Sequence, residues 1–276
     1  MKNLERMINR HPQLIELADY LLPEFFRAFL RRLILGEKFP LAEPFEISVN
    51  STSAQFWINN PSDWYRIAHS GFEEGFIQEL LTSILPSDIF LDIGSAQGLY
   101  AILAAAIGAE VYAIEPDPIS IASLRKNQAL NVELAKNLHI LDMAVGDWTG
   151  NLELNIDPNS VQAASFKRVS PVLSKRVLVP ITTVDILITS QQIKSPTVVK
   201  IDVEGAEYMV LKGMRELLVS NNHPDHLFIE LHKRFWREFD TSLEEIQAYV
   251  TEVGYIPVDN NHTHRNKQFR HFVPAK

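Results

Sequence analysis

The sequence predicts an α/β protein, a three-layer Rossmann-like sandwich in which helices cover both faces of a mostly parallel sheet. From about residue 71 onward, short apolar runs alternate regularly with amphipathic helical patterns. The expected strands are almost continuously apolar, which is typical of parallel strands that are buried on both faces. Ligands of such sheets bind at the carboxyl ends of the strands, so polar residues that follow a strand are the first candidates for function.

The first seventy residues do not share this alternation. Apolar residues recur at helical spacing over 1–36, and residues 40–70 are rich in Pro, Asn and Ser with short β-like pieces at 45–49, 56–58 and 64–67. We therefore expect residues 1–70 to form an N-terminal helical extension and a β-rich connector, and residues 71–276 to form the main domain. The helical stretch could bind a partner, a second copy or a membrane surface, but such helices more often pack on their own domain.

Within the main domain the expected elements follow one another at short spacing. A helix over 71–85 precedes strands at 89–93, 110–114, 140–145, 198–201, 227–231, 255–258 and 269–273. Helical patterns lie between these strands at 98–107, 119–129, 184–192, 206–219 and 243–253. The segments at 152–155 and 177–181 predict further, less regular β-structure.

The composition excludes several classes of function. A formal net charge of −8 disfavours a bulk electrostatic contact with nucleic acid. The sequence has no cysteine, so disulfides, thiolate metal sites and cysteine nucleophiles are excluded. The N-terminal residues are too polar for a secretory signal, and no apolar run approaches the roughly 20 residues of a membrane helix. A cytoplasmic protein without a nucleic-acid partner is the expectation.

The stretch LDIGSAQG, residues 91–98, ends the first of the alternating strands in a glycine loop. Gly94 and Gly98 have a G-x-x-x-G spacing, which is neither the dinucleotide fingerprint nor a phosphate-binding loop. Asp92 stands two residues before the first glycine, where its charge would repel a pyrophosphate and attract an ammonium group. S-adenosylmethionine carries an ammonium and a sulfonium and no phosphate. The loop therefore favours S-adenosylmethionine over a dinucleotide.

The next two strands end in further candidate cofactor contacts. Glu115 lies some twenty residues past the glycines, where an acid can accept hydrogen bonds from both ribose hydroxyls of an adenosine cofactor. Asp142, Met143 and Ala144 end the third strand, where an adenine would lie, and Asp142 could accept from the adenine amino group. A loop or helix-capping acid is the alternative for Asp142, since acids at strand ends are common.

The strand at 198–201 runs directly into a cluster of charges. Alternation places Lys200, Asp202 and Glu204 on one side of the strand, where three charges are unfavourable unless they are paired or functional. A Lys–Asp pair and acids at a helix start would explain them structurally. We adopt that interpretation for Glu207, because negative charge is favourable at a helix N-terminus. Asp202 stands at the carboxyl edge of the sheet and is interpreted as a reaction-site residue.

The following strand, LFIELH, brings in a candidate base. If this strand neighbours the one at 198–201, His232 comes near Asp202, and histidine is the usual general base near neutral pH. His232 or Asp202 could take a proton from a substrate hydroxyl while Asp202 and Glu204 orient that substrate. A divalent cation on Asp202, Glu230 and His232 could instead lower the hydroxyl pKa. The metal-free mechanism is preferred, so no metal ligand is assigned.

Together these segments resemble the FkbM family of S-adenosylmethionine-dependent methyltransferases. The resemblance rests on DIGSAQGLY, AIEPDP, LRKNQALN, MAVGDWTGNLEL, TTVD and, above all, VVKIDVEGAEYMVLKGM followed by FIELH. It spans roughly residues 88–258, and the segment at 200–207 is its most specific part. The sequence departs from the family at Ser95, Ala96 and Gln97, where Ala-Asn-Ile or a similar run is more usual.

The resemblance implies the class I methyltransferase fold, a seven-stranded sheet whose last strand is antiparallel. By position, the cofactor loop would consist of Asp92, Gly94 and Gly98 together with Ser95 and Gln97. Glu115 would contact the ribose, residues 142–144 would flank the adenine, and Asp202 and Glu204 would line the reaction site. Residues 71–276 would then be the methyltransferase catalytic domain.

The resemblance also implies O-methylation of a hydroxyl on a sugar or a secondary metabolite. The predicted function is therefore an S-adenosylmethionine-dependent O-methyltransferase that acts on a sugar, polyketide, lipid or other small metabolite. Two alternatives stay open. One is a non-catalytic cofactor-binding or scaffolding protein on the same fold. The other is a nucleotide-dependent oxidoreductase, against which the missing G-x-G-x-x-G fingerprint counts.

Overall fold

The computed structural model describes residues 43–59, 74–156, 175–258 and 269–275, which fall into two compact units. Residues 43–47 and 55–59 belong to one unit, and residues 48–54 belong to the other with the rest of the described chain. A two-stranded sheet pairs β1 (Glu43–Val49) with β2 (Thr52–Ile58), which confirms the β-like pieces expected there. The helices expected over 1–36 and the β-like piece at 64–67 lie outside the described residues.

The larger unit is built on a seven-stranded sheet in the order β11-β12-β10-β9-β3-β4-β5. Its strands are β3 (Ile89–Ile93), β4 (Glu110–Glu115), β5 (Leu138–Asp142), β9 (Val198–Ile201), β10 (His226–Glu230), β11 (Tyr255–Pro257) and β12 (Phe269–Pro274). The pairs between β10, β9, β3, β4 and β5 are parallel, whereas β12 is antiparallel to both of its neighbours. The predicted mostly parallel sheet with an antiparallel last strand is confirmed.

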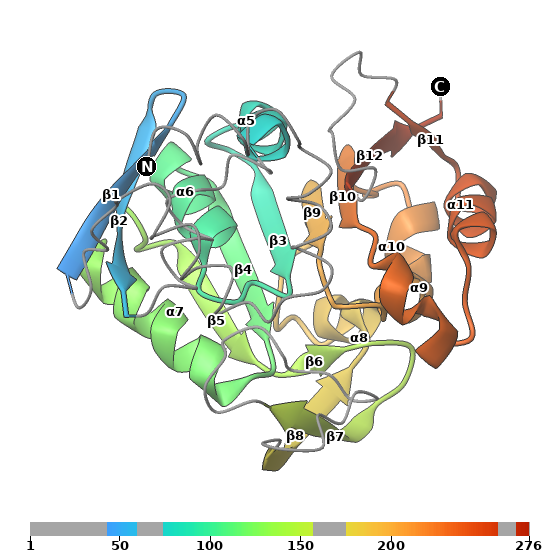
Figure 1. Cartoon of the computed structure of the whole chain (residues 1–276). Coiled ribbons are helices and arrows are strands. Elements are labelled where there is room, and N and C mark those ends of the chain that lie inside the picture. The colour runs from blue at the N-terminus through green and yellow to red at the C-terminus, as the bar shows by residue number, and fades with distance from the viewer. Residues whose placement is uncertain (1–42, 60–73, 157–174, 259–268, 276) are drawn as a thin grey trace, which may run out of the picture. The chain divides into compact units, whose positions relative to one another are not determined.

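Helices cover both faces of this sheet (Figure 1). From β3 the chain proceeds to one edge through β4 and β5, and later to the other edge through β9 and β10, so right-handed crossovers place the connecting helices on opposite faces. The first group is α5 (Glu74–Thr82), α6 (Leu99–Ile107) and α7 (Pro118–Leu130). The second group is α8 (Val184–Thr189), α9 (Glu207–Lys212), α10 (Arg215–Val219) and α11 (Leu243–Glu252).

Alternation along the strands decides which side chains each helical layer covers. Leu91, Ile93 and Val199 belong to one buried apolar cluster with side chains from α8, α9, α10 and α11. Asp92 and Lys200 alternate with them and therefore point to the other face, toward α6. The only way for two such charges to remain at this depth is to satisfy each other or a ligand.

A second, three-stranded sheet follows β5 directly. It consists of β6 (Ala144–Val145), β8 (Lys175–Thr182) and β7 (Gly150–Ile156), and it has its own small apolar cluster. In Figure 1 it lies beyond the arrowhead end of β3. The single strand expected at 140–145 was wrong, because the chain changes sheets at Met143 and the segment forms β5 and β6 instead.

The helix expected at 206–219 is also divided, into α9 and α10. The break lies at Gly213, where an added Cβ would stand 1.8 Å from the carbonyl oxygen of Gly146. The backbone of the β6–β7 loop thus presses against the helix at this point, and an ion pair between Lys212 and Asp147 holds the two together. A 3₁₀ segment at Lys233–Glu238, which the sequence pattern did not indicate, follows β10.

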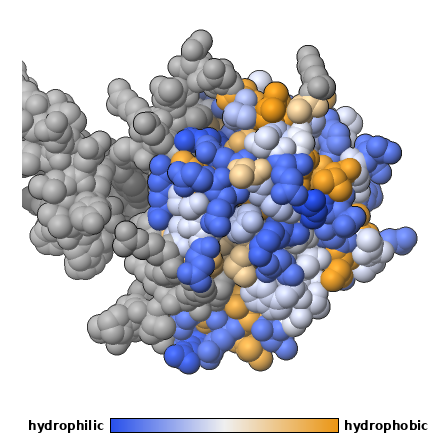
Figure 2. Space-filling model, turned by 90° about the vertical axis from the view of Figure 1, so that its right-hand side faces the viewer, coloured by the Kyte–Doolittle hydropathy of each residue, from blue (hydrophilic) through white to orange (hydrophobic). Residues whose placement is uncertain are grey.

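The surface shown in Figure 2 is mostly hydrophilic over its described residues, and its apolar side chains form small separate patches. Scattered exposed apolar residues are normal on a globular domain and need no partner to explain them. Among the described residues there is no helix with the length and apolar character required to cross a membrane.

Candidate active site

The carboxyl ends of β3, β4, β9 and β10 meet at one edge of the sheet. The amides of Gly94 and Ser95 both donate to the carbonyl of Ile114 at the end of β4, at 2.9 and 3.2 Å. On the other side, the amide of Asp202 donates to the carbonyl of Ile93 at 2.9 Å. Main-chain hydrogen bonds therefore join the glycine loop to the end of β4, and the start of the loop after β9 to the end of β3.

The two glycines of the loop are required by the packing of the chain itself. Gly94 has φ +77°, and an added Cβ would stand 1.8 Å from the carbonyl oxygen of Asp202. Gly98 has φ +85°, and its Cβ would stand 2.1 Å from Leu124 of α7. The close approach that the glycines indicated is thus, in part, the approach of neighbouring chain segments. The loop residues Ser95 and Gln97 are buried.

Glu115 ends β4 and binds the glycine loop directly. Its two carboxylate oxygens accept hydrogen bonds from the amides of Ala96 at 2.8 Å and Asp117 at 2.9 Å. Burial raises the pKa of Glu115 to about 7, while these two amides oppose the shift. A carboxylate has about four acceptor positions, so this group retains capacity for the hydroxyls of a ligand.

Asp92 is fully buried and paired with a cation of the chain itself. It is the cross-strand neighbour of Lys200, whose Nζ lies 3.1 Å from its Oδ1 and 3.5 Å from Oδ2 of Asp202. Burial raises the pKa of Asp92, and Lys200 opposes this shift. Burial also disfavours the charge on Lys200, but the carboxylates of Asp92 and Asp202 outweigh it and raise its pKa. The charge of Asp92, expected to attract a ligand ammonium, is thus already compensated internally.

The residues predicted to flank an adenine lie at the exit of β5. The exposed carboxylate of Asp142 accepts two hydrogen bonds from Arg125 of α7, at 2.6 and 2.8 Å. Met143 packs in part against the main core, and Ala144 is buried at the start of β6. Asp142 has a partner within the chain, and its contact with a cofactor stays a prediction.

Asp202, Glu230 and His232 come together as the sequence predicted, because β9 and β10 are parallel neighbours. His232 Nε2 lies 3.7 Å from Asp202 Oδ1 and 3.5 Å from Glu230 Oε1. The side chain of Asp202 is 27% exposed, against 7% for that of His232. Glu204 follows in a left-handed backbone conformation, with φ +51°, and is partly exposed.

Sequence reasoning missed the role of Glu207. Helix α9 does begin at this residue, but its side chain is fully buried and turns toward His232. The Nδ1–H of His232 donates to Glu207 Oε1 at 2.8 Å, and the amide of Gly205 donates to the same oxygen at 2.9 Å. A signal was present: Glu207 shares the helix face of Val210 and Leu211, which are both buried.

The environment of His232 favours its charged form. Burial lowers the pKa of the imidazole, but the hydrogen bond to Glu207 and the charges of Asp202, Glu230 and Glu204 outweigh burial and raise it to about 10. In this arrangement the ring is held by one carboxylate at Nδ1 and faces two more at Nε2.

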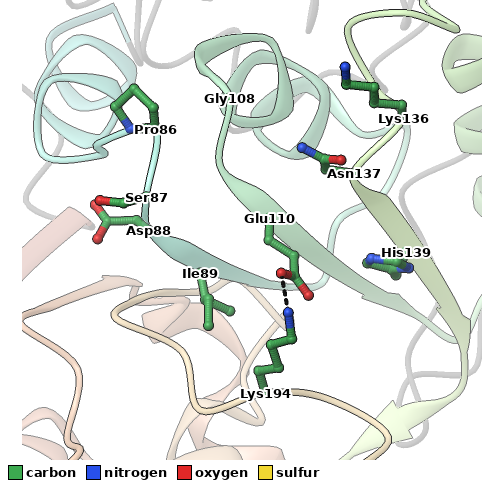
Figure 3. A pocket seen from close by; sticks show the side chains of 10 residues that line it. All are labelled: Pro86, Ser87, Asp88, Ile89, Gly108, Glu110, Lys136, Asn137, His139 and Lys194. Atoms are coloured by element: carbon green, nitrogen blue, oxygen red, sulfur yellow. Dashed lines mark hydrogen bonds and ion pairs between the residues drawn. The ribbon is translucent and has the colours of Figure 1, made fainter.

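A cavity of about 520 Å³ opens at the opposite edge of the sheet, at the amino ends of β3, β4 and β5 (Figure 3). Ile89, Glu110 and His139 line it from these strands, and Lys194 reaches across to Glu110 at 2.6 Å. Ligands of parallel sheets bind at the carboxyl edge, and none of the residues that line this cavity belongs to the contacts described above. We therefore place the candidate active site at the carboxyl edge.

Comparison with known proteins finds similar proteins that are named as methyltransferases. A model of the methyltransferase FkbM domain matches residues 92–257. The hexuronic acid methyltransferase AglP of Haloferax volcanii is 28% identical over 205 residues, which cover 74% of this chain and 81% of that protein. The crystal structure of a methyltransferase FkbM from Methylobacillus flagellatus KT aligns with a TM-score of 0.51 and 17% identity over 97% of this chain. The chain spans only 60% of that structure's length, and the likeness shows the fold.

Proposed function

The chain belongs to the FkbM methyltransferase family, and on that premise we propose that it transfers the methyl group of S-adenosylmethionine to a hydroxyl of a sugar. The sugar class is supported by the relative from Haloferax volcanii, which is named for a hexuronic acid. The proposal extends the family's general activity to one donor and one class of acceptor.

The observation that carries the proposal is the direct contact between the glycine loop and the acidic cluster. The backbone of Gly94 packs against the carbonyl of Asp202, so a donor bound on the loop is adjacent to an acceptor beside Asp202. Methyl transfer is an in-line displacement, and its main requirement is that donor carbon and acceptor oxygen are held in alignment. Two rigidly joined loops meet that requirement.

The residues at this edge fit S-adenosylmethionine better than a dinucleotide. Glu115 offers buried acceptor capacity for ribose hydroxyls, and Ser95, Gln97 and residues 142–144 would complete the contacts. Among the described residues of this edge a pyrophosphate would meet mainly acids, and Lys200 is buried and already engaged by Asp92. When bound, S-adenosylmethionine supplies an electrophilic methyl group on a sulfonium. Asp92 would support cofactor binding indirectly, by holding Lys200 and the glycine loop in place, and would not itself contact the cofactor.

Asp202, His232 and Glu204 are proposed as the reaction site. Asp202 is more exposed than His232, so its carboxylate is the group that an acceptor hydroxyl reaches first and the proposed acceptor of its proton. His232 is fixed by Glu207 with Nε2 toward Asp202, and it positions that carboxylate. Glu204, two residues beyond Asp202, would orient the sugar.

Two measurements test the proposal. Thermal unfolding with S-adenosylmethionine, S-adenosylhomocysteine and NAD in parallel should show stabilisation by the first two only, because a ligand that binds the folded state raises the melting temperature. Transfer of a labelled methyl group to neutral hexoses and hexuronic acids should then be lost in Asp202→Asn and retained in Glu153→Gln, an exposed acid on β7.

The outcomes separate the alternatives. Stabilisation by NAD alone would refute the cofactor assignment and favour an oxidoreductase. Stabilisation by S-adenosylmethionine without transfer to any acceptor would favour a non-catalytic binding protein. A labelled product that carries the methyl group on an atom other than a hydroxyl oxygen would contradict the proposed chemistry.

A further inference from the structure

Three ligand-type atoms face one another where β9 and β10 end. They are Asp202 Oδ1, Glu230 Oε1 and His232 Nε2, and one ligand atom from each of these residues lies within 4.8 Å of the other two. The nitrogen lies 3.5 Å from Glu230 and 3.7 Å from Asp202. Both distances exceed the roughly 2.7–3.2 Å of a good N–H···O hydrogen bond. The three atoms are close, yet they are spaced too widely to serve mainly as hydrogen-bond partners of one another.

We propose that Asp202, Glu230 and His232 form a binding site for a divalent cation of the magnesium or manganese class. Such ions hold their ligands octahedrally at about 2.0–2.2 Å, so two adjacent ligand atoms on one ion stand about 3.0 Å apart. The observed separations of 3.5 and 3.7 Å are somewhat longer, so a small inward shift of the side chains would bring the three atoms to coordination distance. Two carboxylate oxygens with one imidazole suit Mn²⁺ in particular, because carboxylates suit Mg²⁺ and Mn²⁺ while imidazole suits transition metals.

The support behind His232 is an independent observation that fits the same assignment. Glu207 is outside the cluster and fully buried, and it engages Nδ1 of His232 at 2.8 Å. The ring is thereby oriented with Nε2 toward Asp202 and Glu230, although its side chain is more than nine-tenths buried. Histidines that bind metals typically contact a carboxylate through their other nitrogen, which fixes the ring and its tautomer. The chain provides that partner in Glu207.

The two carboxylate oxygens of Asp202 face different partners, so a cation can bind to one of them beside Lys200. Oδ2 of Asp202 lies 3.5 Å from the ammonium of Lys200, whereas Oδ1 is the oxygen directed at His232. Lys200 also contacts Asp92, so it already serves two carboxylates. Glu230 and Glu204 bring further carboxylates to the same side. A divalent cation between Oδ1, Glu230 and His232 would take the place of the proton on Nε2, because a histidine binds a metal ion through a deprotonated ring nitrogen.

This site deepens the proposed function and rests on it for its chemical purpose. Three protein ligands leave coordination positions open, and a hydroxyl that occupies one of them has a lower pKa and gives up its proton more readily. The cation would therefore assist the step in which Asp202 receives the proton of the acceptor. Binding of the cation itself does not depend on the nature of the acceptor or on S-adenosylmethionine.

Titration of the full chain with MnCl₂, followed by the loss of the free-ion electron paramagnetic resonance signal, tests the site without any turnover. The wild-type chain should bind Mn²⁺ at one saturable site from which MgCl₂ competes it away. Glu230→Gln should lose saturable binding. Glu207→Gln should weaken it by about 10–100-fold, the usual effect of removing a partner of a metal-bound histidine. Glu252→Gln, which changes an exposed acid on α11, should bind as the wild type does.

Three results would overturn the proposal: no saturable binding by the wild type, equal affinity in Glu230→Gln, or weak binding shared by all variants and abolished by salt. Circular dichroism of each variant and the melting temperature of the wild type with and without Mn²⁺ guard against unfolding as the cause. The two proposals fail separately. Methyl transfer by a chain that shows no saturable Mn²⁺ binding refutes the cation site alone, whereas saturable Mn²⁺ binding without transfer to any acceptor refutes the proposed function alone. Methyl transfer that continues in EDTA refutes only the assistance of the cation in the proton transfer.

Discussion

Replacing Lys200 by methionine should destabilise the protein strongly, because the substitution removes the cation of a buried ion pair and keeps its approximate volume. Lys200 and Asp92 are almost completely buried, and their charged atoms lie 3.1 Å apart. Removing one partner of such a pair leaves the other without compensation, which costs about 3–5 kcal/mol. We expect a loss in this range for Lys200→Met at pH 8.

The structure predicts that the two partners are not equivalent. In Asp92→Asn the lysine keeps Asp202, 3.5 Å away, so this variant should lose only about 1–3 kcal/mol. In Lys200→Met, Asp92 has no cation left and burial raises its pKa further above its ordinary value. A raised carboxyl pKa contributes stability that is lost as the pH rises, so the deficit of Lys200→Met should be larger at pH 8 than at pH 5.

Urea unfolding of the wild type, both single variants and the double variant at pH 5 and pH 8 measures these differences. The double variant Asp92→Asn/Lys200→Met should be more stable than the sum of the single losses implies, because no charge remains unpaired at Asp92. The reasoning is refuted if Lys200→Met loses less than about 1 kcal/mol. It is also refuted if Asp92→Asn is the more damaging change, or if the deficit does not grow with pH.

Two further predictions concern the cofactor loop. Gly94→Ala should lose at least about 2 kcal/mol of stability and most S-adenosylmethionine affinity, because the new Cβ meets the carbonyl of Asp202 in a left-handed conformation. Gly254→Ala shares the positive φ but has open space around it, so a urea comparison in which both lose the same amount would contradict the steric argument. The affinity for S-adenosylmethionine should rise about tenfold between pH 6 and pH 8, as Glu115 loses its proton near pH 7 and becomes the acceptor that ribose needs. Calorimetry at both pH values measures this, and Glu115→Gln should bind weakly with a flat profile; an unchanged slope in that variant would remove Glu115 from the contact. In the free protein the same raised pKa acts oppositely, so the contribution of Glu115 to stability falls as the pH rises through about 7.

The sequence was sufficient to predict the parallel sheet, because the strands of this sheet are short, apolar and separated by helical patterns. The expected strand at 198–201 coincides with β9, and its neighbour relation to β10 followed from chain order, which brought Asp202 and His232 together. The change of sheet at Met143 could not be predicted, since Asp142 is the only polar residue between Ile140 and Val145 and no glycine or proline marks a break there. Which strand receives the chain next depends on contacts more than thirty residues away along the sequence, between β6 and β8.

The sequence predicted which residues belong to the candidate site better than it predicted which of them contact one another. Asp92 and Lys200 were both noticed, but their contact is a register relation between β3 and β9 that no local pattern contains. Asp92 was accordingly expected to attract a ligand cation, whereas the structure pairs it with Lys200. Glu207 was assigned to helix capping because its position fits that role; its contact with His232 spans twenty-five residues of sequence and a strand crossing.

The backbone contact between Gly94 and Asp202 also affects how ligands enter and leave the candidate active site. Main-chain hydrogen bonds attach the loop after β3 to the end of β4, and the start of the loop after β9 to the end of β3; the backbone of Gly94 also packs closely against the carbonyl of Asp202. The loops after β3 and β9 are therefore expected to keep one conformation during turnover. Product release then depends on segments that do not contact these two loops. Substitutions in the loops after β3 and β9 should therefore alter the affinity for ligands, and substitutions in the other segments should alter the rate of ligand release.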